Sequence, residues 1–187
     1  DIGVTGVQTC ALPIYALEGS YVKLSETLLK LRKVNEAEYY AREALKKSLV
    51  RTGKASLATS RGLHQLAVVM LARERNKDAI YLLEQSLKGL LEAGVTSESI
   101  QLAVTKKTMA AALISDDRYA EALKIYSDLD ITLKNYPETG RFVDANSPDR
   151  ILALVKTGDL ANAEKAAQSL LNLNEVRTGK SSKETTQ

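Results

Sequence analysis

The side chains best suited to chemistry are few and stand apart from one another in the sequence. His64 is the only histidine and Cys10 the only cysteine. A histidine can serve as a general base, but no set of serine, aspartate and cysteine residues accompanies His64. We therefore expect His64 to face a groove or solvent, and we predict no catalytic residue.

A phosphate-binding loop is suggested by Gly179-Lys180-Ser181, because a lysine and a serine after a glycine can contact phosphate and Mg²⁺. The spacing argues against this interpretation. The earlier glycine of such a loop would stand at position 174, which is Asn174, and no strand pattern precedes it. The segment also has a twin at Gly53-Lys54, so we interpret it as a repeated turn and predict no nucleotide site.

Two carboxylate pairs are the remaining candidates for metal ligands. Glu36 and Glu38 form one pair, and Asp116 and Asp117 form the other. Each pair lies at the predicted start of a helix, where negative charge suits the helix dipole. No further ligand set surrounds either pair, so we expect no metal and no cofactor.

Composition favours a helical globular chain. Of the 187 residues, 44% are apolar and 26% are charged, and the aromatic residues are eight tyrosines and one phenylalanine. The 26 basic residues are interleaved with 23 acidic ones, which is typical of a solvated surface and argues against a nucleic-acid stripe. No apolar run approaches the roughly 20 residues that span a bilayer. We therefore expect neither nucleic acid nor a membrane as a partner.

The elements that must position any site recur at a near-constant interval. Ala37, Ala79, Ala122 and Ala163 are separated by 42, 43 and 41 residues, and each opens an amphipathic segment a few residues after a short polar break. A regular period of this length indicates a solenoid in which each unit buries its apolar face on the next. The predicted fold is all-α: a right-handed α-solenoid of stacked antiparallel helix pairs.

The pattern predicts four pairs of helices, with one bend. On the first helix of the first pair, Tyr21, Leu24, Ser25 and Leu28 are predicted to form the inward face, and equivalent residues follow 42 positions later. Ser56 is expected to cap the helix after the turn at 51–56. Two prolines, a glycine and two asparagines at 135–148 predict a bend. The predicted helices span residues 15–32, 36–49, 57–72, 77–91, 97–114, 119–134, 148–156 and 160–173.

Residues 4–14 differ from everything after them. They hold the only cysteine, no charge and no helical period, and they resemble the translation of a common sequencing adapter. A genuine N-terminal strand or leader is the alternative. We predict that residues 1–14 are a non-native, disordered leader, which would make the chain a fragment from a draft or environmental bacterial genome. Removing them should leave the melting temperature unchanged or raised.

The other end of the chain repeats an internal turn. The segment 177–182 (RTGKSS) nearly copies 51–56 (RTGKAS), at an offset of three times 42 residues. We therefore predict that residues 15–175 form the repeat domain and that residues 176–187 are the truncated start of a further repeat.

The spacing of large and small residues resembles that of the tetratricopeptide repeat (TPR). The first copy has Tyr21, Leu24-Ser25 and Leu28, then Ala37, Ala41 and Ala44. The second has Leu63, Leu66-Ala67 and Met70, then Ala79, Leu83 and Ser86. The fourth departs most, with Ile151 in the place of a small residue. The unit of about 42 residues, where 34 is usual, looks like the kinesin-light-chain type of repeat.

The resemblance implies where a ligand would bind. In this family the first helices of successive pairs line a concave surface that receives peptides. Carried over to matching positions, the groove candidates are Val22, Glu26, Leu29, Lys30, Arg61, His64, Val68, Leu71, Val104, Lys107, Ala111 and Ile114. Glu26, Val68 and Ala111 occupy places where chaperone-binding members use asparagine, so we do not expect their carboxylate clamp.

The function that the resemblance implies is a protein-interaction scaffold, not an enzyme, with a peptide or partner domain in its groove. The alternative is a regulatory or sensor arm of a larger enzyme, such as a caspase-like peptidase of the CHAT kind, because bacterial arrays of this type often precede such domains. The sequence leaves the compartment open, with the cytoplasm as the preferred expectation.

Overall fold

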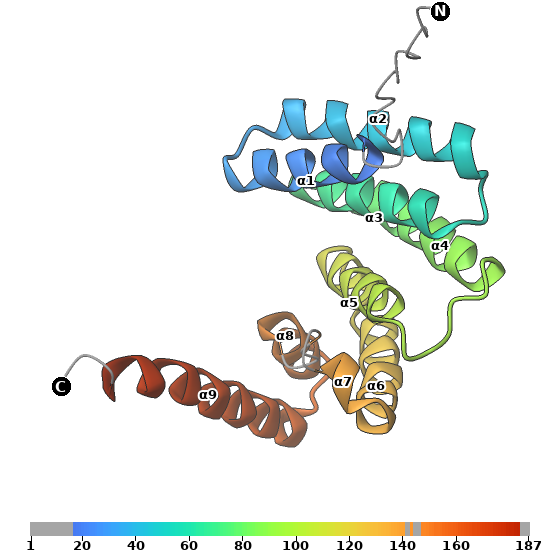
Figure 1. The fold of residues 1–187 in the computed structure, drawn as a ribbon. Helices are drawn as coiled ribbons and strands as arrows, with labels where there is room; N and C mark the ends of the chain where they lie inside the picture. The colour runs from blue at the N-terminus through green and yellow to red at the C-terminus, as the bar shows by residue number, and fades with distance from the viewer. Residues whose placement is uncertain (1–16, 141–142, 144–146, 184–187) are drawn as a thin grey trace, which may run out of the picture.

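The fold was analysed in a computed structural model, which describes residues 17–140, 143 and 147–183 (Figure 1). The leader predicted at 1–14 lies outside these residues. All elements in the described part are helices, as predicted. They are α1 (Leu17–Lys30), α2 (Val34–Thr52), α3 (Leu57–Ala72), α4 (Asn76–Glu92), α5 (Ile100–Ser115), α6 (Tyr119–Asn135), α7 (Pro137–Gly140), α8 (Pro148–Lys156) and α9 (Leu160–Lys183).

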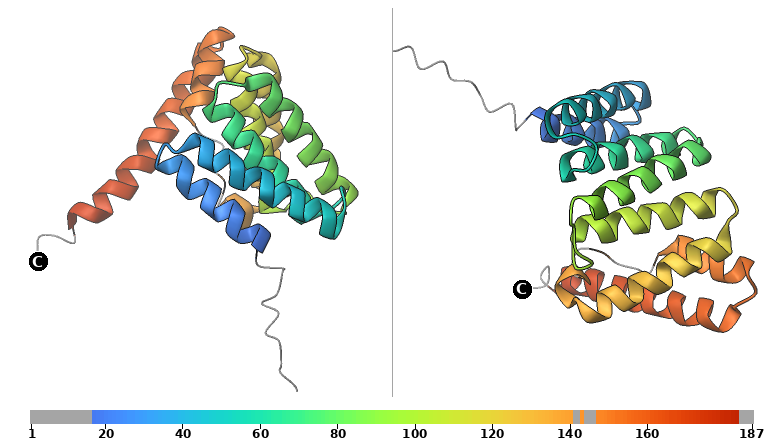
Figure 2. Two further views of the ribbon diagram at one scale, coloured as in Figure 1. Left: turned by 90° about the horizontal axis from the view of Figure 1, so that it is seen from above. Right: turned by 90° about the vertical axis from the view of Figure 1, so that its right-hand side faces the viewer.

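The helices stack as antiparallel pairs, which confirms the predicted α-solenoid. The pairs are α1/α2, α3/α4, α5/α6 and α8/α9, and the two further views show them layered one on the next (Figure 2). The second helix of a pair packs on the first helix of the following pair. First helices also touch one another along the array, from α1 to α3, α5 and α8. The first helices therefore line one continuous side of the stack.

Small residues let the two helices of each pair approach closely. Ala37, Ala79 and Ala122, the repeated alanines of the second helices, are 0% exposed, and Ala163 is 5% exposed. On the first helices, Ala67 is also fully buried. A close helix crossing needs small side chains at the contact. The alanine period therefore predicted the pairing correctly.

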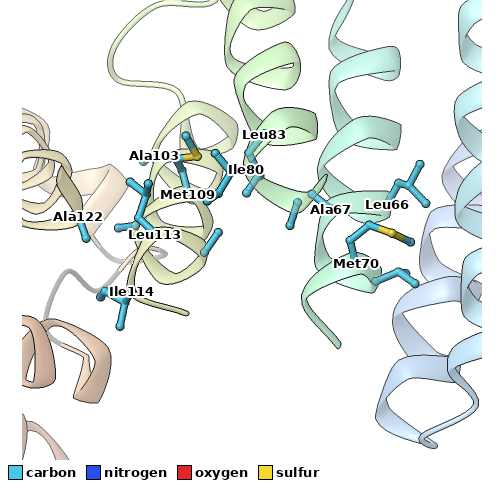
Figure 3. Packing of buried hydrophobic residues seen from close by; sticks show 14 of the residues in the cluster. Leu66, Ala67, Met70, Ile80, Leu83, Ala103, Met109, Leu113, Ile114 and Ala122 are labelled. Atoms are coloured by element: carbon cyan, nitrogen blue, oxygen red, sulfur yellow. The ribbon is translucent and has the colours of Figure 1, made fainter. Parts of the chain in front are cut away.

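One apolar core runs through the first three pairs. Leu66, Ala67 and Met70 of α3 belong to the same buried cluster as Ile80 and Leu83 of α4. Figure 3 shows Ile80 facing Ala103 and Met109 of α5, with Leu113 further along toward Ala122 of α6. Side chains of consecutive pairs thus pack against one another across the boundary between the pairs, so the stability of each pair depends on its neighbours.

The turn within each pair has the same backbone geometry. Arg32, Glu74, Asp117 and Gly158 have φ values of 58°, 59°, 59° and 82°, and their spacing repeats that of the alanines. In the first turn, the Lys33 amide donates to the Leu28 carbonyl and the Arg32 amide donates to the Leu29 carbonyl. This is the Schellman arrangement, which ends a helix with one left-handed residue.

The turn between the first two pairs is closed by the predicted cap. Gly53 has a φ of 75°, and the Ser56 hydroxyl accepts from the Thr59 amide at 3.1 Å. Ser147 caps α8 in the same way, and Pro148 lies in the first turn of that helix, as predicted. Each cap satisfies a backbone amide at a helix start that has no partner within the helix.

The structure corrects three expectations. Leu24 was predicted to face inward, but it is 39% exposed, whereas Leu66, its counterpart one repeat later, is 5% exposed. Leu66 belongs to the core cluster that neighbouring pairs share, whereas no helix before α1 in the described residues covers Leu24. Within the predicted bend, α7 forms a short helix. The third difference is that α9 stays helical across 177–182, where we predicted a turn.

Candidate peptide groove

A cavity of about 510 Å³ opens on the side of the array that the first helices line. Its walls come from α1, α3 and α5, with Ala44 and Arg51 contributed by α2. On this side, α1 contacts α3 and α3 contacts α5. The cavity is therefore a product of stacking, and no single repeat forms it.

Five of the twelve predicted groove residues line this cavity. They are Val22 and Glu26 from α1, Arg61 and His64 from α3, and Val104 from α5. Each is partly or fully accessible. The stacking brings together residues that are more than 80 positions apart in the sequence, at the spacing that the repeat period predicts.

The other seven candidates lie outside the cavity lining. Lys30 is exposed, and Leu29, Val68, Leu71, Lys107 and Ala111 are half-buried. Ile114 requires a correction, because it is only 7% exposed and belongs to the core cluster. Its side chain packs within that cluster, so it does not line the groove.

His64 joins the second helix pair to the third. Its Nε2 atom lies 3.0 Å from the Thr108 hydroxyl of α5. Burial lowers the pKa of His64 below its ordinary value of 6.5, and the nearby carboxylate of Glu26 opposes that shift. The imidazole is therefore neutral at pH 7, and it works as a hydrogen-bonding group with no charge.

An ion pair forms part of the cavity wall. Both guanidinium contacts from Arg51 to Glu18 measure 2.7 Å, and the Glu18 side chain is only 8% exposed. We did not predict either residue as part of the site. No clear signal for this pair existed in the sequence, because two antiparallel helices joined at residues 31–33 place position 18 opposite position 46, and position 51 lies more than one helical turn further along.

Arg61 differs from the other basic residues of the cavity. Lys23 pairs with Glu26 at 2.9 Å, and Arg51 pairs with Glu18. Arg61 instead donates from Nε to the amide oxygen of Gln101, at 3.2 Å. No carboxylate pairs with Arg61 among the described residues, so its terminal nitrogens remain available as donors.

A second, smaller hollow of about 360 Å³ lies between α6, α8 and α9. Its central group, Arg150, is held by both oxygens of Asp130 and lies over the ring of Tyr126 at 5.5 Å. The Tyr126 hydroxyl in turn lies 3.0 Å from that of Ser147. These contacts fix the fourth pair to the third, so we interpret the hollow as structural.

Within the carboxylate pairs at the helix starts, Glu38 and Asp117 contact neighbouring side chains. Glu38 pairs with Arg42 and Arg73, and Asp117 accepts from the Tyr119 hydroxyl at 2.5 Å. Across residues 17–140, 143 and 147–183, no group of three or more histidine, cysteine or acidic side chains could hold a metal ion. In the same residues, no helix is long and apolar enough to cross a membrane.

Comparison with known proteins found similarity only to solved structures. No family model matches the chain, and no curated protein matches it. A variant of the putative kinesin light chain TPR-like repeats from Podosopora anserina is 15% identical, with a TM-score of 0.63. The match covers 87% of this chain and 76% of that one.

Two further solved structures are also similar to this chain. BtubC (BKLC) from P. vanneervenii is 14% identical with a TM-score of 0.73, and the match covers 89% of this chain and 66% of that one. A TPR-like protein from Chlorobium tepidum is also 14% identical, with a TM-score of 0.56 and coverage of 80% and 98%. Identities this low carry information on the fold only. Together with the four stacked helix pairs, they show that this chain has a TPR-like repeat fold.

Proposed function

We propose that this chain is a protein-interaction scaffold that holds a segment of a partner protein along its first helices. The observation that supports the proposal most directly is the cavity, where Val22, Arg61 and Val104 of three successive repeats meet. A segment bound there would contact several repeats at once. That arrangement suits a solenoid, whose extended inner surface is its usual binding face.

The chemistry of the cavity suits a peptide. Its walls combine aliphatic side chains with hydrogen-bonding groups such as Gln65 and Gln101. A few polar groups within a partly apolar wall are what orients a bound ligand. No observation on the described residues favours the alternative of a regulatory arm on a CHAT-type peptidase, which stays a prediction from the sequence.

The test is selection of a random ten-residue peptide library on the whole chain at pH 7.5. We expect binders whose affinity falls at least about tenfold in Arg61→Glu, a loss of roughly 1.4 kcal/mol. The matched control is Lys77→Glu, an exposed position on α4 outside the cavity lining. Lys107→Glu on α5 extends the test to the rest of the predicted groove.

The proposal fails if no peptide is selected. It also fails if the selected peptides bind Arg61→Glu and Lys77→Glu equally well, since binding would then lie elsewhere on the array.

A further inference from the structure

The hydrogen bonds around His64 determine which of its ring nitrogens carries the proton. The Thr108 hydroxyl donates its single proton to the Val104 carbonyl, at 3.0 Å. Its oxygen can therefore only accept from His64, so Nε2 must be the donor in the 3.0 Å contact between them. A neutral imidazole has one N–H, which leaves Nδ1 as an acceptor.

Nδ1 of His64 is accessible and has no protein partner among the described residues. Two polar side-chain atoms in that part of the chain are both unpaired and completely buried, and this nitrogen is not one of them. His64 lines the cavity wall, so a ligand can reach this nitrogen. The cavity therefore presents a hydrogen-bond acceptor that no protein group uses.

Arg61 presents the complementary donors. Residues 61 and 64 are three apart on α3, so they are neighbours on one helix face, with Cβ atoms about 5–6 Å apart. The Arg61 guanidinium uses Nε for Gln101 and keeps its terminal N–H groups free. One wall of the cavity thus offers an acceptor and a donor side by side.

We propose that this wall binds an amide group of the partner segment, with its N–H on Nδ1 of His64 and its carbonyl on Arg61, and that protonation of His64 releases it. The inference rests on the proposed function and specifies its ligand chemistry. A main-chain peptide group or the side chain of an asparagine or glutamine carries both complementary atoms. The ligand class is therefore an uncharged amide.

The direction in which affinity changes with pH distinguishes an amide ligand from a carboxylate ligand. Protonation of Nδ1 removes the acceptor, so an amide ligand is lost as the pH falls. A carboxylate ligand would instead gain from the new positive charge. The charged groups facing His64 in the cavity are Glu18, Lys23 and Glu26 of α1, Arg51 of α2 and Arg61 of α3, and the α5 wall is uncharged.

The first measurement is a long-range ¹H–¹⁵N spectrum of the whole chain. His64 is the sole histidine, so its imidazole signals need no assignment. We expect the Nε2–H tautomer in the free protein. Adding the peptide selected at pH 7.5 should shift the Nδ1 resonance in a saturable manner and lower the pH at which His64 titrates.

The second measurement is the affinity of that peptide as the pH is taken through the titration of His64. We expect affinity to fall about fivefold or more, which corresponds to one lost hydrogen bond. In His64→Gln, whose amide can still reach Thr108, affinity should be about fivefold lower at pH 7.5 and independent of pH over the same range. Lys77→Gln should follow the parent chain, and melting curves check that both variants fold.

Four results would overturn the inference while leaving groove binding intact. They are an Nδ1–H tautomer in the free protein, an affinity that rises on acidification, no response of Nδ1 to the peptide, and an unchanged pH profile in His64→Gln. Failure to select any peptide would overturn the proposed function, and this inference with it.

Discussion

The first three helix pairs and the fourth pair bury their apolar residues differently. Helices α1 to α6 contribute to one continuous cluster that passes from pair to pair. In the fourth pair, Leu154, Ala163 and Ala166 form a small separate cluster, against which Ile151 packs. Only Ala153 of α8 joins the larger core.

The residue at the helix crossing accounts for this difference. Ser25, Ala67 and Ala110 occupy the small position of the first three pairs, and each is 0% exposed. The fourth pair has Ile151 there, and it is half-buried. A bulky side chain disfavours the close helix crossing that small residues permit, and the fourth pair has its own small cluster. Small residues at the crossings therefore make the array continuous.

The largest expected effect comes from filling a crossing in the continuous core. Ala67→Leu should lower the free energy of unfolding by roughly 1–3 kcal/mol, because the added atoms have no space. Ala166→Leu in the fourth pair, where the alanine is 9% exposed, should cost less than about 1 kcal/mol. Urea unfolding of both variants makes the comparison. Equal losses would show that the two cores are packed alike.

A glycine between the first two pairs should give the next effect. A Cβ on Gly62 would lie 3.0 Å from the Cα of Leu45, so Gly62→Ala has to push α2 and α3 apart. We expect a net loss of about 1 kcal/mol, because overpacking outweighs the helix propensity that alanine adds.

Gly19→Ala is the matched control for that change, since nothing lies within 4 Å of its added Cβ. It should raise stability by about 0.5–1 kcal/mol. If Gly62→Ala also stabilised the protein in thermal melts, the contact between the first two pairs would be looser than the structure shows.

The ion pairs at the two ends of the array should differ as well. Glu18→Gln removes the negative charge that faces Arg51 while keeping the shape of the side chain, and because the Glu18 side chain is only 8% exposed it should cost about 1 kcal/mol. Asp130→Asn should cost less than that, because the Asp130 side chain is 46% exposed and is screened by solvent. Chemical denaturation at low and high salt tests this, and the difference should shrink at high salt. A larger loss in Asp130→Asn would reverse the ranking.

The smallest expected effect is a pH dependence that originates in the first three pairs. Because burial lowers the pKa of His64, the folded chain binds fewer protons than the unfolded chain below pH 6.5. His64 should therefore reduce stability progressively as the pH falls below 6.5, and it should have no effect above that. The measurement is the unfolding free energy against pH for the parent and His64→Gln. Parallel curves would contradict it.

The sequence alone predicted the architecture because helical periodicity is local. The spacing of Ala37, Ala79 and Ala122 marks the buried side of each second helix, and the polar breaks before them mark the turns. The predicted bounds of α3 and α8 agree with the structure. The resemblance to TPR proteins added the expectation that the first helices line the groove, and five of its residues line the cavity.

What the tertiary structure decided is which of those residues a ligand can reach. Val104 and Ile114 lie on the same helix and were predicted alike, yet Val104 lines the cavity and Ile114 is buried in the core. Leu24 and Leu66 occupy the same place in the repeat, and only Leu66 is covered. The period of a helix determines which face it turns inward. The position of the neighbouring pair determines whether that face is closed over, and that position depends on contacts between residues about 40 positions apart, such as His64 with Thr108.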